Sequence, residues 1–227
     1  KNYGDSSKFL KLANQLKLFL NPSNADSLIN NSKVLLIESD KKEITRPANK
    51  EYPESIFIVG MPRSGSTLIE SVISMNANVN DLGESNILEE SFLEKKKFDK
   101  EFSLTDLYLK KITHDKSKLY ITTNKCLYNY QYAGIISTQI KNAKIIHCYR
   151  NPLDNILSIF RAHFDKGNEY SSSLVDCARV YLDQEEVMKE YKDRFRSKIF
   201  DLNYDSLVSN PNKEIKSLIS WMGWKWD

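Results

Sequence analysis

A loop that could bind an anion lies within residues 55–67, where the sequence reads SIFIVGMPRSGST. Its apolar run, residues 56–59, is typical of a strand buried on both faces, and Gly60 ends that run. Apolar residues then recur at helical spacing from Leu68, so the sequence predicts a strand, a tight turn and a helix in succession. The backbone N–H groups and the partial positive charge at the start of such a helix attract anions. Hydroxyl groups that could donate further hydrogen bonds are those of Ser64, Ser66 and Thr67.

The details of this loop distinguish it from the loop that binds nucleoside triphosphates. That loop reads G-x-x-x-x-G-K-[ST], and its lysine reaches the outer phosphates. Gly60 and Gly65 have the same spacing, but Ser66 occupies the lysine position and the fixed cation is Arg63. The sequence therefore predicts a site for a phosphate-bearing donor that has no γ-phosphate.

A second segment with anion-binding residues is AKIIHCYRNPLDNILSIFRAHF, residues 143–164. It predicts a strand that delivers Arg150 to its carboxyl end and a helix that begins at Pro152. Ser158 follows Arg150 by eight residues, two turns into the helix. The two side chains can bind one phosphate from two directions, with charge-assisted hydrogen bonds from the guanidinium. The residues predicted to form the buried face of the helix are Leu153, Ile156, Leu157, Phe160 and Phe164.

The elements that must position these residues follow an alternating order. Strands are predicted at 56–59, 119–123, 144–149 and 198–203. Further helices are predicted at 86–96, 103–113, 127–140, 152–165 and 172–195. Alternation of this kind predicts an α/β fold, with a P-loop-like parallel sheet covered by helices on both faces. Because ligands of such sheets bind at the carboxyl ends of the strands, the chemistry is expected just after residues 60, 123, 149 and 203.

The N-terminal part of the sequence predicts a separate helical segment, residues 1–50, ahead of an α/β domain at 51–227. One helix is predicted at 5–20, with Asp5 or Ser6 as its N-cap, and another at 25–38. A polar connector follows at 40–54. The two helices could be the end of a helical repeat array or a helical cap on the main domain. In either case they offer a surface for a protein partner.

Composition narrows the function classes. The net charge is +3 and the lysines are scattered, which indicates a solvated surface rather than a nucleic-acid-binding stripe. Cys126, Cys148 and Cys177 are dispersed, so neither a disulfide framework nor a zinc site is expected, and Cys148 is predicted to lie in the core. No apolar run approaches the ~20 residues that span a membrane, so a cytoplasmic protein without a membrane contact is expected.

Taken together, the two anion-binding segments resemble a known family. Residues 63–67 resemble the 5′-phosphosulfate loop of sulfotransferases that use 3′-phosphoadenosine 5′-phosphosulfate (PAPS), and Arg150 with Ser158 resembles their 3′-phosphate pair. LNYDSLVSNP, residues 202–211, is similar to the motif before the last core helix of that family, and residues 215–227 are similar to that helix and its turn.

The resemblance covers roughly residues 52–227. With the N-terminal helical pair, the chain resembles bacterial sulfotransferases that carry tetratricopeptide repeats and a catalytic domain close to protein-tyrosine sulfotransferases. The family continues past the helix that ends near Gly223, whereas this sequence stops at Asp227, so a C-terminally truncated domain is expected.

The resemblance also implies roles for individual residues. Arg63, Ser64, Gly65, Ser66 and Thr67 would bind the 5′-phosphosulfate of PAPS, and Arg63 would also take part in catalysis. Glu84, in the turn NVNDLGESN, matches the general base of the tyrosine-sulfating branch. Lys125, in TTNKC, matches a lysine that stabilises the bridging oxygen as the donor bond breaks, and Asn124 is expected to orient this region. No metal is implied, and the hydroxyl acceptor could be a protein tyrosine, a glycan or a small alcohol.

Two other functions remain open from the sequence. One is a P-loop kinase or NTPase with a degenerate loop, which the serine at position 66 disfavours. The other is a non-catalytic nucleotide-binding module on a helical repeat scaffold. The histidines suggest no catalytic role, because His147 is predicted to be a strand residue facing a helix, and His114 and His163 are predicted to lie on the surface.

Overall fold

The central strand, β1 (Ser55–Gly60), is buried along its whole length, as its apolar run predicts. It pairs in parallel with β3 (Ile121–Asn124) on one side and with β4 (Ala143–Tyr149) on the other. The outer strands are β2 (Val79–Asp81), next to β3, and β5 (Ile199–Asn203), next to β4, so the strand order is β2-β3-β1-β4-β5. All four pairings are parallel, which places every carboxyl end on one edge of the sheet.

The structure is a computed structural model that describes residues 2–41, 52–98, 102–112, 121–164 and 166–226. The helices before β3 are α1 (Tyr3–Leu20), α2 (Ala25–Ser39), α3 (Ser66–Ile73), α4 (Ile87–Phe98) and α5 (Leu104–Ile112). Those after β3 are η1 (Leu127–Tyr132), α6 (Ala133–Gln139), α7 (Pro152–Arg161), η2 (Glu169–Ser172), α8 (Leu174–Phe195), η3 (Arg196–Lys198), α9 (Tyr204–Ser209) and α10 (Pro211–Met222), where η marks a 3₁₀ turn.

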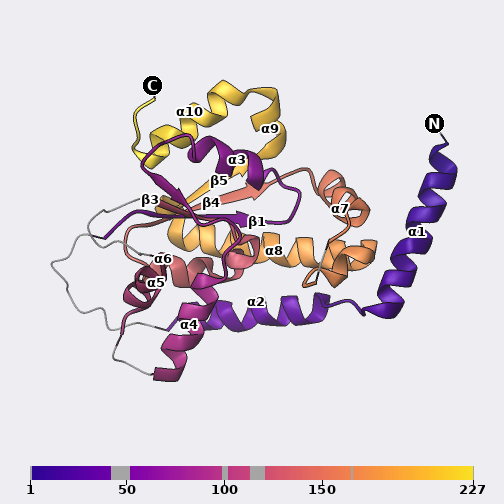
Figure 1. Cartoon of the computed structure of the whole chain (residues 1–227), viewed down its shortest axis with the longest axis horizontal. Helices are drawn as coiled ribbons and strands as arrows, with labels where there is room; N and C mark the ends of the chain where they lie inside the picture. Colours follow the sequence, from indigo (N-terminus) through magenta and orange to yellow (C-terminus); the bar gives the residue numbers. More distant parts are fainter. Residues whose placement is uncertain (1, 42–51, 99–101, 113–120, 165, 227) are drawn as a thin grey trace.

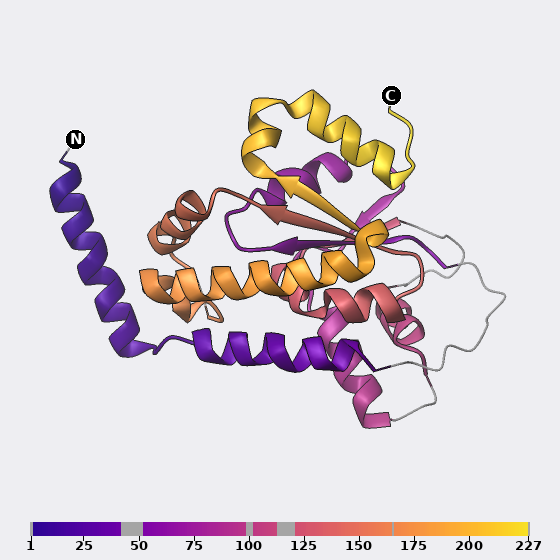
Figure 2. The same ribbon diagram turned by 180° about the vertical axis from the view of Figure 1, so that it is seen from behind.

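The sheet is covered on both faces, as Figures 1 and 2 show. Phe57 and Val59 of β1 belong to the core on one face, together with residues of α2, α4, α5, α6 and α8. Ile56 and Ile58 belong to the core on the other face, beneath α3, α9 and α10. Alternate residues of one strand thus serve two cores. The predicted α/β fold with a parallel sheet between helical layers is confirmed.

Some element boundaries differ from the predictions. β2 and α9 were not predicted, since VND and YDSLVS are too short to show a hydrophobic period. The helix expected at 127–140 begins as the 3₁₀ turn η1, and the helix expected at 152–165 ends at Arg161. The N-cap of α1 is Asn2, whose side chain accepts a hydrogen bond from the backbone N–H of Asp5, so neither Asp5 nor Ser6 is the cap. Most of the 40–54 connector, residues 119–120 and His114 lie outside the described residues.

The buried face of α7 agrees with the prediction only in part. Phe160 is buried and Ile156 packs against the core, as predicted, but Leu153 and Leu157 are 79% and 48% exposed, and Asn155 and Ile159 are buried instead. The cause is a hydrogen bond. Asn155 Nδ2 donates to the carbonyl of Pro62, 3.0 Å away, and this bond turns Asn155 inward. Periodicity alone could not predict that a polar residue would define the inner face.

The second N-terminal helix is part of the main helical layer. α2 packs along α8, and its Leu35 lies in the same core as Phe57. Ser32 Oγ donates to Asp183 Oδ2 at 2.7 Å. α1 is joined to the rest through the buried Asn14, whose amide donates to the Phe160 carbonyl at 3.0 Å.

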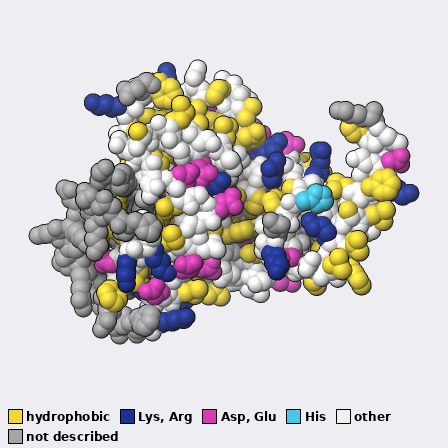
Figure 3. Space-filling model, in the orientation of Figure 1, with side chains coloured by type: hydrophobic (Ala, Val, Ile, Leu, Met, Phe, Trp, Pro, Cys, Tyr) yellow, Lys and Arg dark blue, Asp and Glu magenta, His cyan; other side chains and the backbone are white. Residues whose placement is uncertain are grey.

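The surface of α1 carries a row of hydrophobic side chains (Figure 3). The exposed residues spaced three or four apart are Phe9, Leu12, Leu16 and Phe19. This spacing gives α1 an apolar stripe on the side away from Asn14.

A buried histidine links the sheet to α8. His147 lies in β4, its Nδ1 is 3.1 Å from Asp201 Oδ1 on β5, and its Nε2 is 2.8 Å from Gln184 Nε2 on α8. It is therefore a strand residue that faces a helix, as predicted, and Cys148 beside it is a core residue.

Burial raises the pKa of Asp201, but hydrogen bonds from His147 and Arg196 and the charge of Lys192 outweigh burial, so the pKa of this carboxyl is lowered.

We expect Asp201→Asn to reduce the free energy of unfolding at pH 7 and to flatten its fall in acid. Since the folded-state pKa of Asp201 is depressed, its contribution is fully present above the unfolded carboxyl pKa of about 3.9 and is lost progressively below it. Urea unfolding at a series of pH values from 7 down to 3 would measure the difference between wild type and variant. The exposed Asp193 on α8 provides the control Asp193→Asn. A difference for Asp201→Asn that stays constant below pH 4 would contradict this account.

Candidate active site

The loop between β1 and α3 lies at the carboxyl edge of the sheet and has an unusual backbone. Arg63 has φ 68° and Gly65 has φ 89°, both in the left-handed region. Such a conformation costs a non-glycine residue free energy and is often retained at binding sites. Ser64 is only 2% exposed, and its Oγ has no hydrogen-bond partner. An unpartnered buried hydroxyl next to the free N–H groups of a helix start fits an anion as its missing partner.

Two contacts hold this loop in place. Asn155 supports it from α7 through the hydrogen bond to the Pro62 carbonyl. Tyr204, the first residue of α9, lies against Gly65, where a Cβ atom would be 2.3 Å from Tyr204 Cδ2. Gly65 is thus required both by its φ and by the closeness of this ring.

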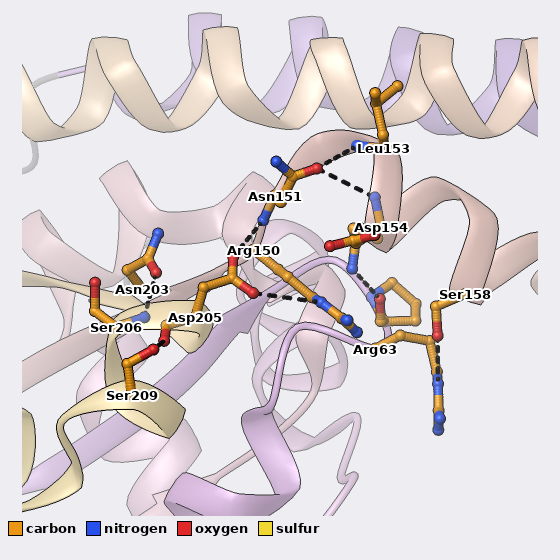
Figure 4. Close-up of polar contacts among 12 residues, drawn as sticks. Arg63, Arg150, Asn151, Leu153, Asp154, Ser158, Asn203, Asp205, Ser206 and Ser209 are labelled. Atoms are coloured by element: carbon orange, nitrogen blue, oxygen red, sulfur yellow. Dashed lines mark hydrogen bonds and ion pairs between the residues drawn. The ribbon is translucent and has the colours of Figure 1, made fainter.

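The structure brings Arg150 and Ser158 to the same edge as the loop. Arg63 Nε donates to Ser158 Oγ at 3.3 Å, which joins the loop to α7 (Figure 4). The Arg150 guanidinium carbon lies 5.0 Å from the centroid of the Tyr204 ring, on the same tyrosine that packs against Gly65. Tyr204 therefore sits between the two predicted anion-binding groups.

Arg150 has a weak partner in this structure. Its buried Nε makes no hydrogen bond, and the nearest carboxylate oxygen, Oδ1 of Asp205, is 3.8 Å away (Figure 4). Asp205 Oδ2 accepts a hydrogen bond from the backbone N–H of Asn151 at 2.9 Å, so the carboxylate is held by the backbone next to Arg150. A phosphate could supply the hydrogen bond that Arg150 Nε lacks.

Glu84 and Lys125 also meet, and the unpredicted strand β2 is the reason. After β2 the chain continues beside the end of β3, with Leu82 N–H donating to the Thr123 carbonyl and Lys125 N–H donating to the Gly83 carbonyl, both at 2.9 Å. These bonds place Glu84 Oε1 3.4 Å from Lys125 Nζ. Lys125 Nζ is also 3.5 Å from Thr67 Oγ1, at the start of α3.

Asn124 supports the backbone before Lys125. It is fully buried, and its Oδ1 accepts hydrogen bonds from Cys126 N–H at 3.1 Å and from Asn129 Nδ2 at 3.0 Å. Its Nδ2 donates to the carbonyl of Ser85 at 3.1 Å. Asn124 thereby ties the end of β3 to the turn that carries Glu84.

The closest partner of Lys125 is Glu70, which was not predicted from the sequence. Glu70 Oε2 lies 2.7 Å from Lys125 Nζ, and the two side chains are only 10% and 9% exposed. Burial raises the pKa of Glu70, against the lowering effect of Lys125. The signal was available, since Glu70 is the one acidic residue of α3 and lies three residues after Thr67, hence one turn along the same helix. The other residues missed at this edge are Asn155, Tyr204 and Asp205.

No group of three or more histidine, cysteine, aspartate or glutamate side chains among the described residues is arranged to hold a metal ion. No helix within the described ranges has both the length and the apolar character needed to cross a membrane.

Comparison with known proteins identifies the family. The model of the sulfotransferase family matches residues 90–227, more than half of the chain, and the chain therefore belongs to that family. An uncharacterized protein of Aquifex aeolicus (strain VF5) is 26% identical over 195 residues, which are 76% of this chain and 26% of that protein. The chain thus spans only about a quarter of the length of this relative.

Solved sulfotransferase structures share the fold. The sulfotransferase domain of the Synechococcus PCC 7002 olefin synthase superposes with a TM-score of 0.56 at 15% identity, covering 82% of this chain and 78% of that one. A sulfotransferase of Mycobacterium tuberculosis H37Rv gives 0.52 at 9% identity, covering 97% and 90%. The sulfotransferase domain of the curacin biosynthetic pathway gives 0.51 at 16% identity, covering 78% and 76%.

We expect Gly65→Ala to destabilise the protein more than Gly167→Ala does. Both glycines have positive φ, 89° and 94°, so both variants carry the backbone cost of roughly 1–2 kcal/mol. Only the Cβ at position 65 meets a ring, whereas nothing lies within 4 Å of one at position 167. The clash should add about 1–3 kcal/mol to the loss in free energy of unfolding, as overpacking does. Equal losses in urea unfolding would show that Tyr204 does not constrain the loop.

Proposed function

We propose that this protein transfers a sulfuryl group from PAPS to a hydroxyl acceptor. One observation carries the proposal, namely that the loop after β1 and the Arg150–Ser158 pair meet at one sheet edge. Arg63 Nε is hydrogen-bonded to Ser158, and Ser64 Oγ and Arg150 Nε are buried without hydrogen-bond partners. Two groups of anion-binding residues side by side suit a nucleotide with phosphates on both sides of its ribose. Membership of the sulfotransferase family supports the same reaction.

In this proposal the residues divide the donor between them. Residues 63–67 bind the 5′-phosphosulfate through backbone N–H groups, the hydroxyls of the loop and the Arg63 guanidinium. Arg150 and Ser158 bind the 3′-phosphate. Tyr204 fixes the spacing of the two groups, because it contacts both Gly65 and Arg150.

The proposed chemistry is an in-line displacement at sulfur, by analogy with phosphoryl transfer. The acceptor oxygen forms a bond to sulfur while the bond from sulfur to the bridging oxygen breaks, and adenosine 3′,5′-bisphosphate leaves with the bonding electron pair. The acceptor proton goes to Glu84. Arg63, Lys125 and the N–H groups of the loop offset the negative charge that builds on the bridging and phosphate oxygens. No step is assigned to a metal ion.

The proposal extends to the kind of acceptor and to a surface that could bind a protein partner. A protein tyrosine, a glycan and a small alcohol all carry the hydroxyl that the reaction needs. The resemblance of the sequence to protein-tyrosine sulfotransferases and to enzymes with tetratricopeptide repeats leads us to propose a protein acceptor first. The exposed apolar stripe of α1 supports a protein partner at the N-terminal helices, since burying such a stripe is favourable.

We expect Arg150→Ala to weaken binding of adenosine 3′,5′-bisphosphate by roughly 1.5–3 kcal/mol, the range for hydrogen bonds to charged groups. Binding of adenosine 5′-phosphate should hardly change, because it lacks the 3′ group. Isothermal titration calorimetry with both nucleotides would measure this. Arg194→Ala is the control, since Arg194 lies in the last turn of α8, where it pairs with Asp40. Equal losses for the two nucleotides would contradict a specific 3′ contact.

An activity assay of the wild-type protein tests the proposed sulfuryl transfer itself. Transfer of labelled sulfate from PAPS to phenolic, glycan and small-alcohol acceptors should proceed in buffer that contains a chelator. Turnover of ATP that depends on magnesium would favour the kinase or NTPase function instead. Binding of the bisphosphate without any turnover would favour a non-catalytic module.

We expect Glu84→Gln to lower the transfer rate by about 10²–10⁴-fold, the usual contribution of a general base. The amide keeps the size of the side chain and removes its capacity to take the proton, so binding of the bisphosphate should persist. Steady-state kinetics and calorimetry would separate the two effects. Glu90→Gln removes the charge of an exposed glutamate that pairs with Lys111 on the neighbouring helix and is the matched control. Unchanged turnover in Glu84→Gln would rule out Glu84 as the base.

A further inference from the structure

The carboxylates around Lys125 differ sharply in their surroundings. Glu84, the proposed base, lies 3.4 Å from Lys125 Nζ with a side chain 74% exposed. Glu70 lies 2.7 Å from the same nitrogen with a side chain 10% exposed. Water screens the first interaction and is nearly excluded from the second, so Glu70 dominates the electrostatic environment of Lys125.

Glu70 also ties Lys125 to the donor loop. Glu70 and Thr67 are one turn apart on α3, and both contact Lys125 Nζ, at 2.7 Å and 3.5 Å. α3 is the helix whose first turn completes the loop at residues 63–67. The loop follows β1, whereas Lys125 follows β3. The contacts with Glu70 and Thr67 of α3 are therefore what hold the Lys125 ammonium group close to the loop.

We propose that Glu70 is a positioning residue that holds the Lys125 ammonium group against the start of α3, where the bridging oxygen of the donor would lie. The inference rests on the proposed function, because Lys125 acts on that oxygen only in sulfuryl transfer. Glu70 itself touches neither the donor nor the acceptor.

The cost of burying Glu70 argues against a role in stability alone. Its second carboxylate oxygen, Oε1, is buried without a hydrogen-bond partner. Burial raises the pKa of Glu70, and the nearby Asp81 carboxylate raises it further. A buried ion pair with an unsatisfied oxygen rarely stabilises a fold more than apolar side chains of similar volume would. An interaction that stability does not require is better explained by the placement of Lys125.

Glu70 also keeps Lys125 charged. Burial lowers the pKa of Lys125, but the hydrogen bond and charge of Glu70, with a smaller contribution from Glu84, outweigh burial and leave that pKa raised. The other titratable groups nearby are Asp81 of β2, which acts on Glu70, and Cys126, whose pKa burial raises to about 11. Without Glu70 the burial of Lys125 would remain and its main partner would be gone, so its pKa would fall.

The test compares Glu70→Gln with Glu54→Gln. Glu54 forms an equally short pair with Lys144, also 2.7 Å, with side chains 14% and 25% exposed, at the amino edge of the sheet. Both variants should lose free energy of unfolding, but only Glu70→Gln should lower kcat, by about 10²-fold, as misplacing a catalytic group by 1 Å can do. The KM for PAPS should change little, and the alkaline limb of the pH–rate profile should move to lower pH. An equal loss of kcat in both variants, or an unmoved alkaline limb, would overturn the proposal.

A second variant and an NMR titration distinguish the role proposed for Glu70 from an effect on folding and from a failure of the proposed function. Glu70→Met leaves Lys125 buried without its main partner, so it should lower the free energy of unfolding as Glu70→Gln does and should also lose kcat when assayed where the variant is folded; retained kcat would overturn the proposal. A ¹³C NMR titration of lysine-labelled protein, with Lys125→Arg to assign the signal, should show a lower pKa for Lys125 in Glu70→Gln than in wild type. This readout needs no turnover, so a wild type that transfers no sulfuryl group would refute the proposed function, whereas an unchanged pKa would refute the role of Glu70.

Discussion

The parallel pairing of β1 with both of its neighbours is the constraint on which the rest of the structure depends. Six residue pairs join β1 to β4, and three join it to β3, all in the same direction. Because every strand then ends at the same edge, segments far apart in sequence are brought together there. The loop after β1, Lys125 after β3, Arg150 after β4 and Tyr204 after β5 owe their closeness to this arrangement.

At this edge each cation has an oxygen partner from another element, and the partners differ in strength. Lys125 has a short, buried partner in Glu70, whereas Arg150 faces Asp205 at 3.8 Å and Arg63 donates only to a serine hydroxyl. The arginines thus retain hydrogen-bonding capacity for an anion, and the lysine is held. Such a division is what the proposed function requires, in which arginines bind the donor and one fixed lysine acts in the reaction.

Much of this could be predicted, and the failures have physical causes. The strand at 56–59 and the loop after it are evident because an apolar run and a glycine-rich turn are local properties. The inner face of α7 was predicted only in part, because a hydrogen bond from Asn155 to Pro62, 93 residues away in sequence, turns the helix away from the face that its hydrophobic period favours. β2 was missed because a strand of three residues, which is defined by its pairing with β3, is too short to carry a pattern of its own.

The sequence by itself determined the α/β class and made the loop at 63–67, Arg150 and Ser158 candidates for anion binding, since these depend on residue types at short spacing, whereas Glu84 and Lys125 became candidates through the resemblance to sulfotransferases. Only the tertiary structure decided that Glu70 is the closest partner of Lys125 and that Tyr204 lies between the loop and Arg150. A contact between residues 55 or 139 positions apart leaves no periodic trace, because the packing of separate elements, rather than local propensity, brings the two side chains together.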